Sequence, residues 1–589
     1  MEIDEKELKK QMCRHSLSHV LAKAVKNIFG AENVKLAIGP AIDNGFYYDF
    51  DMEGISQEKY EQIEKEMRAI IGRCEEFKRV ELTREQANEL FKNEPYKLEL
   101  ISELPEGETI SCYYLGEDFV DLCRGPHVES TAKLQSYAFK INRVSGAYWK
   151  GDEHNKMLQR IYVYAFPDKK QLADYINQVE EAKKRDHNKI GRELEYFTTV
   201  DYIGQGLPVL LPKGSKTIQI LQRFVEDEEE SRGYLLTKTP LISKNDIFKI
   251  SGHWDHYKES MFVLGDEEKD SEVFCMRPMT CPFQYQVYLN RQRSYKDLPM
   301  RLGETSTLFR KEASGECHGL IRLRQFTISE GHLIVRPDQL ENEFKGCLDL
   351  ATYMLKTLGL FEDVTFRFSK WDENNKEKYI GSKEEWENVQ GEMRRILTDL
   401  NVDFYEADGE AAFYGPKLDI QIKNVHGKED TIVTIQIDFQ IAERFGMYYI
   451  DENGQKKMPY IIHRTALGCY ERTLAYLLEK YAGALPLWMS AEQVKVMNIA
   501  ESSEDYAREI HNKLRSAGIR SVLDVRNEKI GYKIREAVTG KIPYMIIVGD
   551  GEKENNTISI RGRGNENQSG LKFEDFLARL QEEIKTLKK

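Results

Sequence analysis

The stretch FRKEASGECHGLIRLRQF at residues 309–326 predicts two strands joined by a polar loop that contains glycine. From this hairpin Arg310 can point at a phosphate group, and Phe326 can offer an aromatic face from the second strand. Farther along, GCYER at residues 468–472 opens a predicted helix and places the guanidinium of Arg472 nearby. The chain contains no GxxxxGKS or GxxxxGKT loop. These arginines are therefore the candidate phosphate-binding groups, because a planar guanidinium fork matches phosphate oxygens.

Strands dominate the sequence around this hairpin, from about residue 195 to residue 485. They return on themselves without a regular alternation of strand and helix, which favours an antiparallel α+β core. The predicted strands lie around Phe262 and at 301–309, 322–327, 365–368 and 431–439, and the predicted helices at 338–357 and 384–400. The acidic run at 226–230 is predicted to be one exposed helix face, with no role assigned.

The 589 residues divide into four predicted segments, which makes the fold class multidomain α+β. Residues 1–167 mix helices, at about 8–28 and 57–74, with short strands such as 46–50. Residues 168–194 read as one charged linker helix, and the antiparallel core follows at 195–485. Residues 486–589 alternate strands with helices, as expected for a small α/β domain.

Composition narrows the class of protein. Hydrophobic residues make up 41% of the chain, which is enough for several buried cores. No stretch approaches the ~18 apolar residues of a membrane helix, and the N-terminus lacks the features of a signal or transit peptide. Nine scattered cysteines are not a disulfide framework. The net charge of −13 disfavours general polyanion binding, but the tail from about residue 491 is slightly basic and suits a local contact. We expect a soluble, cytoplasmic protein without a membrane partner.

Two motifs near the N-terminus carry histidine and cysteine. HSLSH at 15–19 places His15 and His19 on one face of a helix, because residues four apart share a face. DLCRGPH at 121–127 places Cys123 and His127 on a turn, because Gly-Pro forbids a regular helix there. The four side chains could hold zinc as soft ligands. They could instead position a water molecule and a substrate hydroxyl for general acid–base hydrolysis.

A second set of metal-binding residue types is interleaved with the arginine segments. Cys281 lies in PMTCP, His332 in SEGH and His463 in IIHR. Each taken singly would be an ordinary core residue. Together they suggest a zinc site with one thiolate, two imidazoles and an open fourth position, which is an arrangement that binds a substrate.

The combination resembles the threonyl-tRNA synthetases, a family of class II aminoacyl-tRNA synthetases. The stretch at 309–326 is similar to motif 2 of that class, GCYER to motif 3, and Gly233–Pro240 to the end of motif 1. The resemblance covers essentially the whole chain through HSLSH, DLCRGPH, GAYWKGD, PMTCP, HLIV, FYGPK, IIHR, RNEKIGYKIRE and PYMIIVGD. It implies an editing domain at 1–167, a linker helix at 168–194, a class II catalytic domain with an antiparallel sheet at 195–485, and an anticodon-binding domain at 486–589.

The resemblance also implies residue roles in ATP-dependent threonine activation and transfer to tRNA(Thr). The ATP site, with Mg²⁺, would comprise Arg310, Glu312, Arg322, Phe326 and Arg472. Zinc would be bound by Cys281, His332 and His463, the amino-acid pocket would include Glu330, Tyr414, Lys417 and Cys469, and His253 would assist transfer. The editing site would comprise His15, His19, Lys97, Asp121, Cys123 and His127, and the anticodon would be read by Asn527, Glu552 and Arg561.

A threonine enzyme must reject both valine and serine, and zinc and editing would each reject one of them. A hydrophobic pocket gains only about 1–3 kcal/mol from a methyl-sized difference, whereas a metal that needs a hydroxyl ligand rejects valine. Serine carries the same hydroxyl, so a second, hydrolytic site is the expected remedy. The resemblance favours an editing site without an obligatory metal.

The sequence departs from the family pattern in three places. The ubiquitin-like domain that commonly precedes the editing region is expected to be absent, since the chain opens almost directly on HSLSH. Glu330 stands where aspartate is frequent, and Cys469 where serine is common. A homodimer is carried over from class II enzymes. Two other hypotheses are a catalytically silent RNA-binding regulator and a metallohydrolase, and threonine-dependent ATP–pyrophosphate exchange separates them from the ligase.

Overall fold

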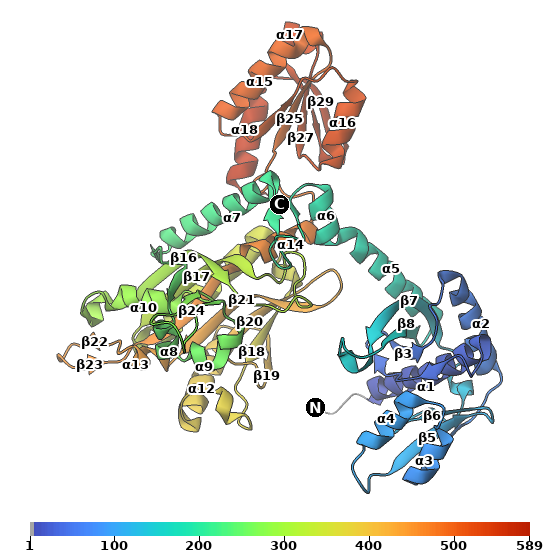
Figure 1. Ribbon diagram of the computed structural model, residues 1–589. Helices are drawn as coiled ribbons and strands as arrows, with labels where there is room; N and C mark the ends of the chain where they lie inside the picture. Colours follow the sequence, from blue (N-terminus) through green and yellow to red (C-terminus); the bar gives the residue numbers. More distant parts are fainter. Residues whose placement is uncertain (1–4, 589) are drawn as a thin grey trace. The chain divides into compact units, whose positions relative to one another are not determined.

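The computed structural model describes residues 5–588, in two compact units that divide between Glu181 and Ala182 (Figure 1). The predicted linker at 168–194 is not one helix, and that prediction was wrong. Helix α5 (Lys169–Arg185) ends before Asp186, and α6 (His187–Glu193) begins after it. The carboxylate of Asp186 accepts the main-chain N–H of Asn188 at 2.7 Å and caps α6, so the side chain competes with continuation of the helix.

The first unit combines helices with two antiparallel sheets. One sheet has the order β1-β3-β8-β7 with β2 beside β3, and the other has the order β4-β5-β6. Its long helix α1 and helix α2 share a hydrophobic core with residues of both sheets. The helices are α1 (Glu5–Phe29), α2 (Tyr60–Gly72), α3 (Arg84–Leu90) and α4 (Pro95–Glu103). The strands are β1 (Lys35–Leu36), β2 (Ala41–Ile42), β3 (Gly45–Asp51), β4 (Phe77–Leu82), β5 (Ile110–Leu115), β6 (Phe119–Leu122), β7 (Ala138–Tyr148) and β8 (Met157–Phe166).

An eight-stranded sheet forms the centre of the second unit, in the order β11-β16-β17-β24-β21-β20-β18-β19. All neighbouring strands are antiparallel except the two edge pairs, which are parallel. The predicted antiparallel core is therefore confirmed. The strands are β11 (Leu235–Leu236), β16 (Met300–Phe309), β17 (Gln325–Val335), β18 (Val364–Ser369), β19 (Phe404–Ala407), β20 (Lys417–Lys423), β21 (Glu429–Asp438) and β24 (Tyr460–Cys469).

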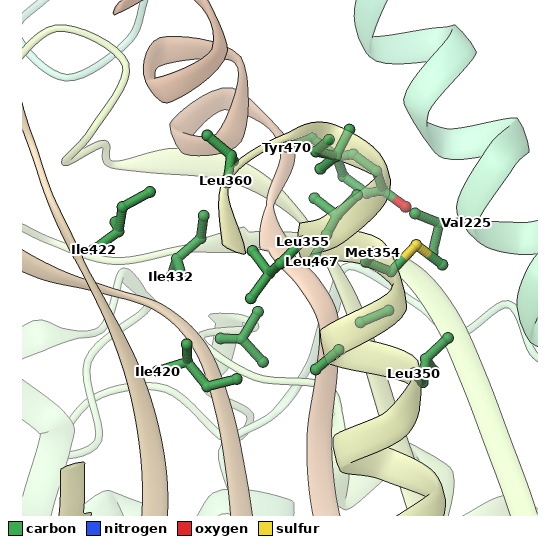
Figure 2. Packing of buried hydrophobic residues seen from close by; sticks show 14 of the residues in the cluster. Val225, Leu350, Met354, Leu355, Leu360, Ile420, Ile422, Ile432, Leu467 and Tyr470 are labelled. Atoms are coloured by element: carbon green, nitrogen blue, oxygen red, sulfur yellow. The ribbon is translucent and has the colours of Figure 1, made fainter. Parts of the chain in front are cut away.

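The two faces of this sheet differ because side chains alternate along each strand. Leu333 of β17 and Ile462 of β24 belong to the main core with helices α7 (Pro212–Ser231), α11 (Leu340–Leu358), α12 (Lys383–Asp399) and α14 (Tyr470–Lys480). Figure 2 shows this packing, with Met354 and Leu355 of α11 beside Leu467 of β24 and Tyr470 of α14. The neighbours Ile334 and Ile461 face the other way, toward α10 (Cys281–Leu289). That second face carries the candidate site.

The acidic run at 226–230 was predicted to be one exposed helix face, and for Glu229 that prediction was wrong. Glu229 of α7 is buried, and its carboxylate pairs with the buried guanidinium of Arg464 on β24. A buried charge is tolerated when it is paired, so this pair ties α7 to the sheet.

The C-terminal part of the second unit has a five-stranded sheet, in the order β26-β25-β27-β28-β29. The first three strands are parallel, and the last two are antiparallel additions. Strand β29 and helix α17 were not predicted. The strands are β25 (Val494–Asn498), β26 (Ser521–Asp524), β27 (Tyr544–Val548), β28 (Ile558–Gly562) and β29 (Asn567–Leu571), and the helices are α15 (Glu504–Ser516), α16 (Ile530–Thr539), α17 (Asp550–Asn555) and α18 (Phe573–Lys585).

Short elements complete the second unit. They are β9 (Phe197–Thr198), β10 (Val209–Leu210), β12 (Ile242–Lys244), α8 (Asp246–Ser251), α9 (His253–Tyr257), β13 (Val263–Leu264), β14 (Phe274–Met276), β15 (Arg293–Ser294), α13 (Ile441–Arg444), β22 (Tyr449–Ile450) and β23 (Lys456–Lys457). Within residues 5–588, no helix is both long enough and apolar enough to span a membrane. All nine cysteines are free thiols.

Candidate active site

The cysteine and two histidines predicted as zinc ligands meet on the open face of the eight-stranded sheet. Cys281 is the first residue of α10, and His332 and His463 lie opposite each other on β17 and β24. Their ligand atoms lie within 4.8 Å of one another, and all three side chains are buried. The pairing of β17 with β24 thus brings together two histidines that are distant in sequence.

His332 is oriented by a chain of hydrogen bonds. Its Nδ1 lies 2.6 Å from Oε1 of Gln284, whose Nε2 donates to Oγ1 of Thr237 at 2.8 Å. Because the amide nitrogen is engaged by Thr237, the amide oxygen accepts the proton of Nδ1. Nε2 of His332 then carries a lone pair, and it is buried without a hydrogen-bond partner among the described residues. Such an unsatisfied lone pair fits a soft divalent cation such as zinc.

His463 is held in a comparable way. Its Nε2 lies 3.0 Å from the carboxylate of Asp438, which also accepts the main-chain N–H groups of Gln440 and Ile441 at 2.9 Å each. This leaves Nδ1 of His463 available for a metal. Burial raises the pKa of the Cys281 thiol well above its usual range and lowers that of His332 well below it. A bound cation would supply the positive charge that favours the thiolate.

A cavity of about 610 Å³ opens in front of this cluster. Its lining includes every side chain predicted for ATP, threonine and transfer, together with Cys281 and His463. His332 does not line the cavity and is fully buried. Residues from position 253 to position 472 are therefore brought to one site.

Arg310 and Arg472 approach the cavity from different elements. Arg310 follows the last residue of β16, and its guanidinium carbon lies 5.3 Å from the centroid of the Phe326 ring. Arg472 is held by two main-chain carbonyls, since its Nε donates to Ile321 at 2.9 Å and its Nη1 to Thr431 at 2.7 Å. A guanidinium fixed in this way is preorganised for an anionic ligand.

The second strand of the hairpin begins later than predicted. Strand β17 starts at Gln325, so Arg322 lies in the loop and not on a strand. The main chains of His318 and Arg322 bond to each other and close a tight turn, which keeps this segment out of the sheet. Nε and Nη2 of Arg322 donate to the carboxylate of Glu312 at 2.9 and 2.8 Å. The loop therefore holds these two predicted ATP residues together.

The predicted amino-acid pocket lies beside the histidines. Glu330 accepts the main-chain N–H of Thr280 at 3.2 Å, and its other oxygen lies 3.8 Å from Nε2 of His332. The hydroxyl of Tyr414 donates to Gln436, and Lys417 pairs with Asp419 at 3.0 Å. The thiol of Cys469 donates to the carboxylate of Glu471 at 3.2 Å, and burial raises its pKa.

His253, the first residue of α9, is buried at the edge of the same cavity. Its Nδ1 lies 2.8 Å from Oγ of Ser251. Burial, together with the nearby His463, His256 and Arg310, lowers its pKa to about 3. The imidazole is therefore neutral at physiological pH and can accept a hydrogen bond.

The four N-terminal side chains converge in the first unit. His15 and His19 project from α1, and Cys123 and His127 follow β6. Sγ of Cys123 lies 3.4 Å from Nε2 of His15 and 3.2 Å from Nε2 of His127, and it accepts the N–H of Gly125 at 3.2 Å. Burial lowers the pKa of all three histidines and raises that of Cys123 to about 12. The cluster is thus a thiol among neutral imidazoles.

A buried ion pair adjoins this cluster. Lys97 lies 2.5 Å from Asp121, whose other oxygen accepts the hydroxyl of Tyr48 at 2.5 Å. The same oxygen of Asp121 lies 3.7 Å from Nε2 of His19. The ligand atoms of His15, His19, Cys123 and His127 all lie within 4.8 Å of one another. The geometry fits both a soft metal and acid–base hydrolysis.

The three predicted anticodon residues border the α16 side of the C-terminal sheet. Glu552 of α17 accepts the hydroxyl of Ser559 at 2.7 Å, and Arg561 lies two residues farther along β28, on the same face. Arg561 pairs with Met545, which packs with residues of α16. Asn527 is exposed in the loop that leads from β26 into α16.

Sequence reasoning missed the residues that orient the predicted ones. Gln284 follows Cys281 by three positions on α10, and that helical spacing was the only available signal. Asp438 lies on β21 with no motif around it, so nothing in the sequence connected it with His463. Asp419 follows Lys417 by two residues on β20, and this strand spacing, which places both side chains on one face, was the available signal.

Three family models match the chain. The tRNA synthetase class II core domain (G, H, P, S and T) matches residues 262–481, and the anticodon binding domain matches 493–583. The second additional domain of threonyl and alanyl tRNA synthetases matches 110–162. Each match lies inside one of the four predicted segments.

Curated relatives resemble the chain along nearly its whole length. A threonine–tRNA ligase of Clostridium perfringens (strain SM101 / Type A) is 61% identical over 571 residues, which are 97% of this chain and 88% of the relative. The chain belongs to the threonine–tRNA ligase family. A ligase of Staphylococcus aureus (strain Newman) is 45% identical over 98% of this chain and 89% of its own length. The crystal structure of the RNA binding domain of a threonyl-tRNA synthetase from Cryptosporidium parvum Iowa II matches with a TM-score of 0.63 and 30% identity, over 67% of this chain and 98% of that one.

Membership in the threonine–tRNA ligase family confirms several predictions. The resemblance, the class II fold and the ligase activity stand as predicted, and the matched additional domain is the one linked to editing. ATP-dependent catalysis with Mg²⁺ and a tRNA partner follow from the family and its anticodon binding domain.

Proposed function

We propose that this threonine–tRNA ligase binds L-threonine and ATP in the cavity in front of Cys281, His332 and His463. Cys281, His463, Arg310 and Arg472 line this cavity, and the ligand atoms of Cys281, His332 and His463 lie within 4.8 Å of one another; this arrangement carries the proposal. Threonine-dependent ATP–pyrophosphate exchange tests it, because exchange requires activation of the amino acid. The proposal is refuted if the zinc-loaded full chain shows no exchange.

One zinc ion per chain is proposed for this site. Held by Sγ of Cys281, Nε2 of His332 and Nδ1 of His463, it would supply vacant positions for the amino and hydroxyl groups of threonine, which valine cannot fill. Glu330, whose Oε1 lies 3.8 Å from Nε2 of His332, would accept a hydrogen bond from the substrate amino group. Tyr414, Lys417 and Cys469 would line the rest of the pocket.

The arginines would act on ATP. Activation joins the threonine carboxylate to the α-phosphorus and releases pyrophosphate, so negative charge builds on the phosphoryl oxygens. Arg310 and Arg472 would stabilise that charge, and Mg²⁺ bound with ATP would share it. Phe326 offers its ring to the adenine, and Glu312 and Arg322, paired in the loop, would border the base.

His253 is proposed to accept the proton from the tRNA ribose hydroxyl during transfer. Its pKa of about 3 keeps the imidazole neutral throughout the working range of pH. We expect the single-turnover rate of transfer from the adenylate to remain constant from pH 7.5 down to pH 6. For an ordinary histidine with a pKa near 6.5, the neutral fraction would fall about fourfold over that interval. A fourfold fall in rate would contradict the role.

The N-terminal cluster is proposed to hydrolyse Ser-tRNA(Thr). Neutral His15, His19 and His127 would position water and the ribose hydroxyl, and the Lys97–Asp121 pair would support His19. The proposed mechanism needs no metal. Segments 1–167, 168–194, 195–485 and 486–589 are proposed as the editing, linker, catalytic and anticodon-binding domains.

Replacing Cys123 with alanine should lower hydrolysis of Ser-tRNA by about 10²-fold or more while threonine-dependent exchange stays unchanged. The thiol contacts two of the three histidines, so its loss changes the hydrolytic site but not the proposed activation site, which belongs to the other unit. Deacylation of isolated Ser-tRNA measures the effect. Cys112→Ala, which removes a buried sulfur from the same unit, is the matched control. Unchanged hydrolysis would remove Cys123 from the mechanism.

Asn527, Glu552 and Arg561 are proposed to read anticodon bases of tRNA(Thr). Their polar side chains border one side of the C-terminal sheet, where a single-stranded loop can present its base edges. Footprinting of tRNA(Thr) on the chain and on its Arg561→Ala variant tests this assignment.

A homodimer is proposed, with the cytoplasm as the location. Leu235 and Ile242, on β11 and β12, expose 57% and 47% of their surface beside the exposed Leu236 and Leu241. A second copy related by a two-fold axis would remove this apolar patch from water. We expect a dimer by sedimentation at micromolar concentration, and Leu236→Glu should weaken it. A monomer for the unaltered chain would refute the dimer.

A further inference from the structure

His187, the first residue of α6, is fully buried although it belongs to the segment predicted as one charged linker helix. Its Nδ1 lies 2.7 Å from the carboxylate of Glu479, which is itself buried on α14. Its Nε2 lies 3.3 Å from the main-chain nitrogen of Leu320, in the loop that carries Glu312 and Arg322. One imidazole therefore connects three elements: α6, α14 and the loop at 310–324.

The hydrogen-bond roles in this bridge are determined by the partners. The main-chain N–H of Leu320 can only donate, so Nε2 of His187 accepts. Nδ1 then carries the proton and donates to Glu479, whose second oxygen accepts the N–H of Val425 at 3.2 Å. Both ring nitrogens of His187 therefore have a hydrogen-bond partner.

The loop is held in place at consecutive residues. Leu320 is bound by His187 through its N–H, and the carbonyl of Ile321 accepts Nε of Arg472 at 2.9 Å. The two contacts reach the loop from α6 and α14. Gly319 allows the close approach, because a Cβ at this position would lie 2.1 Å from Nε2 of His187.

We propose that His187 is a positioning residue for ATP: it fixes the loop at 310–324 relative to α14, and so sets the distance of Glu312 and Arg322 from Arg472. The inference rests on the proposed ATP-binding role of that loop. Nothing in this role requires His187 to touch the nucleotide, since it acts through the main chain of Leu320.

His187→Ala should raise the KM for ATP in threonine-dependent exchange about tenfold, because the loop loses one anchor and the two halves of the ATP site no longer keep their spacing. The KM for threonine and the zinc content should change less than twofold, since Cys281, His332 and His463 lie on other elements. A general loss of structure would change all three quantities together.

His187→Gln is the rescuing variant. Its amide can donate to Glu479 from nitrogen and accept the N–H of Leu320 at oxygen, so the KM for ATP should return to within about threefold of the unaltered chain. His154→Ala, at an exposed histidine of the first unit, is the matched control and should change nothing.

Gly319→Ala tests the same contact from the loop, without creating a buried cavity. The added methyl would displace Leu320 from His187, and the KM for ATP should rise as in His187→Ala. The inference is overturned if both His187→Ala and Gly319→Ala leave the KM for ATP within twofold, or if threonine KM rises equally. Arg322→Ala distinguishes failure of the positioning role of His187 from failure of the proposed ATP-binding role of the loop. If Arg322→Ala also leaves the KM for ATP unchanged, it is the ATP-binding role of the loop that fails.

Discussion

Replacing Cys281 with alanine is expected to reduce the zinc content of the chain from about one ion to nearly none and to lower threonine-dependent exchange by about 10³-fold. Two imidazoles without the thiolate form an incomplete ligand set, and the threonine hydroxyl loses the group that selects it. Elemental analysis of the purified chain measures the metal, and ATP–pyrophosphate exchange measures activation.

Two other cysteines provide controls for this experiment. Cys347→Ala removes an equally buried sulfur from α11, on the other face of the sheet, and should retain both zinc and exchange. Cys123→Ala should retain zinc as well if the N-terminal cluster works without metal. Loss of the ion from Cys123→Ala with retention in Cys281→Ala would place the zinc in the first unit and contradict the proposed threonine site.

Replacing Arg310 with alanine is expected to lower kcat/KM for ATP in the exchange reaction by about 10²–10³-fold, or about 3–4 kcal/mol of transition-state stabilisation. The reason is that Arg310 reaches the cavity beside Phe326, where phosphoryl charge would develop. Steady-state exchange over a range of ATP concentrations measures the effect.

Lys311→Ala is the matched control, because Lys311 is the exposed neighbouring cation and does not line the cavity. It should leave kcat/KM within about twofold. If the two variants lose activity equally, the effect is one of general surface charge, and the specific role of Arg310 is wrong.

Local patterns predicted much of this fold because they depend on short-range geometry. The 3.6-residue period identified α1, and the GCYER segment marked the start of α14, where Arg472 lies. The linker at 168–194 failed for a reason that is also local: Asp186 bonds the main chain of Asn188, and this outweighs the helical period on either side. The hydrophobic period records the spacing of apolar side chains and does not detect the competing hydrogen bond of Asp186.

The sequence by itself determined the chemical inventory: a cysteine and two histidines able to hold zinc, two arginines able to meet phosphate, and a second cluster of histidines with Cys123. Only the tertiary structure decided which atoms of these groups are free to act. Gln284 leaves Nε2 of His332 unpaired, Glu229 pairs with Arg464 although it lies in an acidic run, and Glu479 pairs with a linker histidine that also contacts the loop at 310–324. Each partner comes from an element distant in sequence, and its approach is set by how helices pack on the sheet, which no local pattern records.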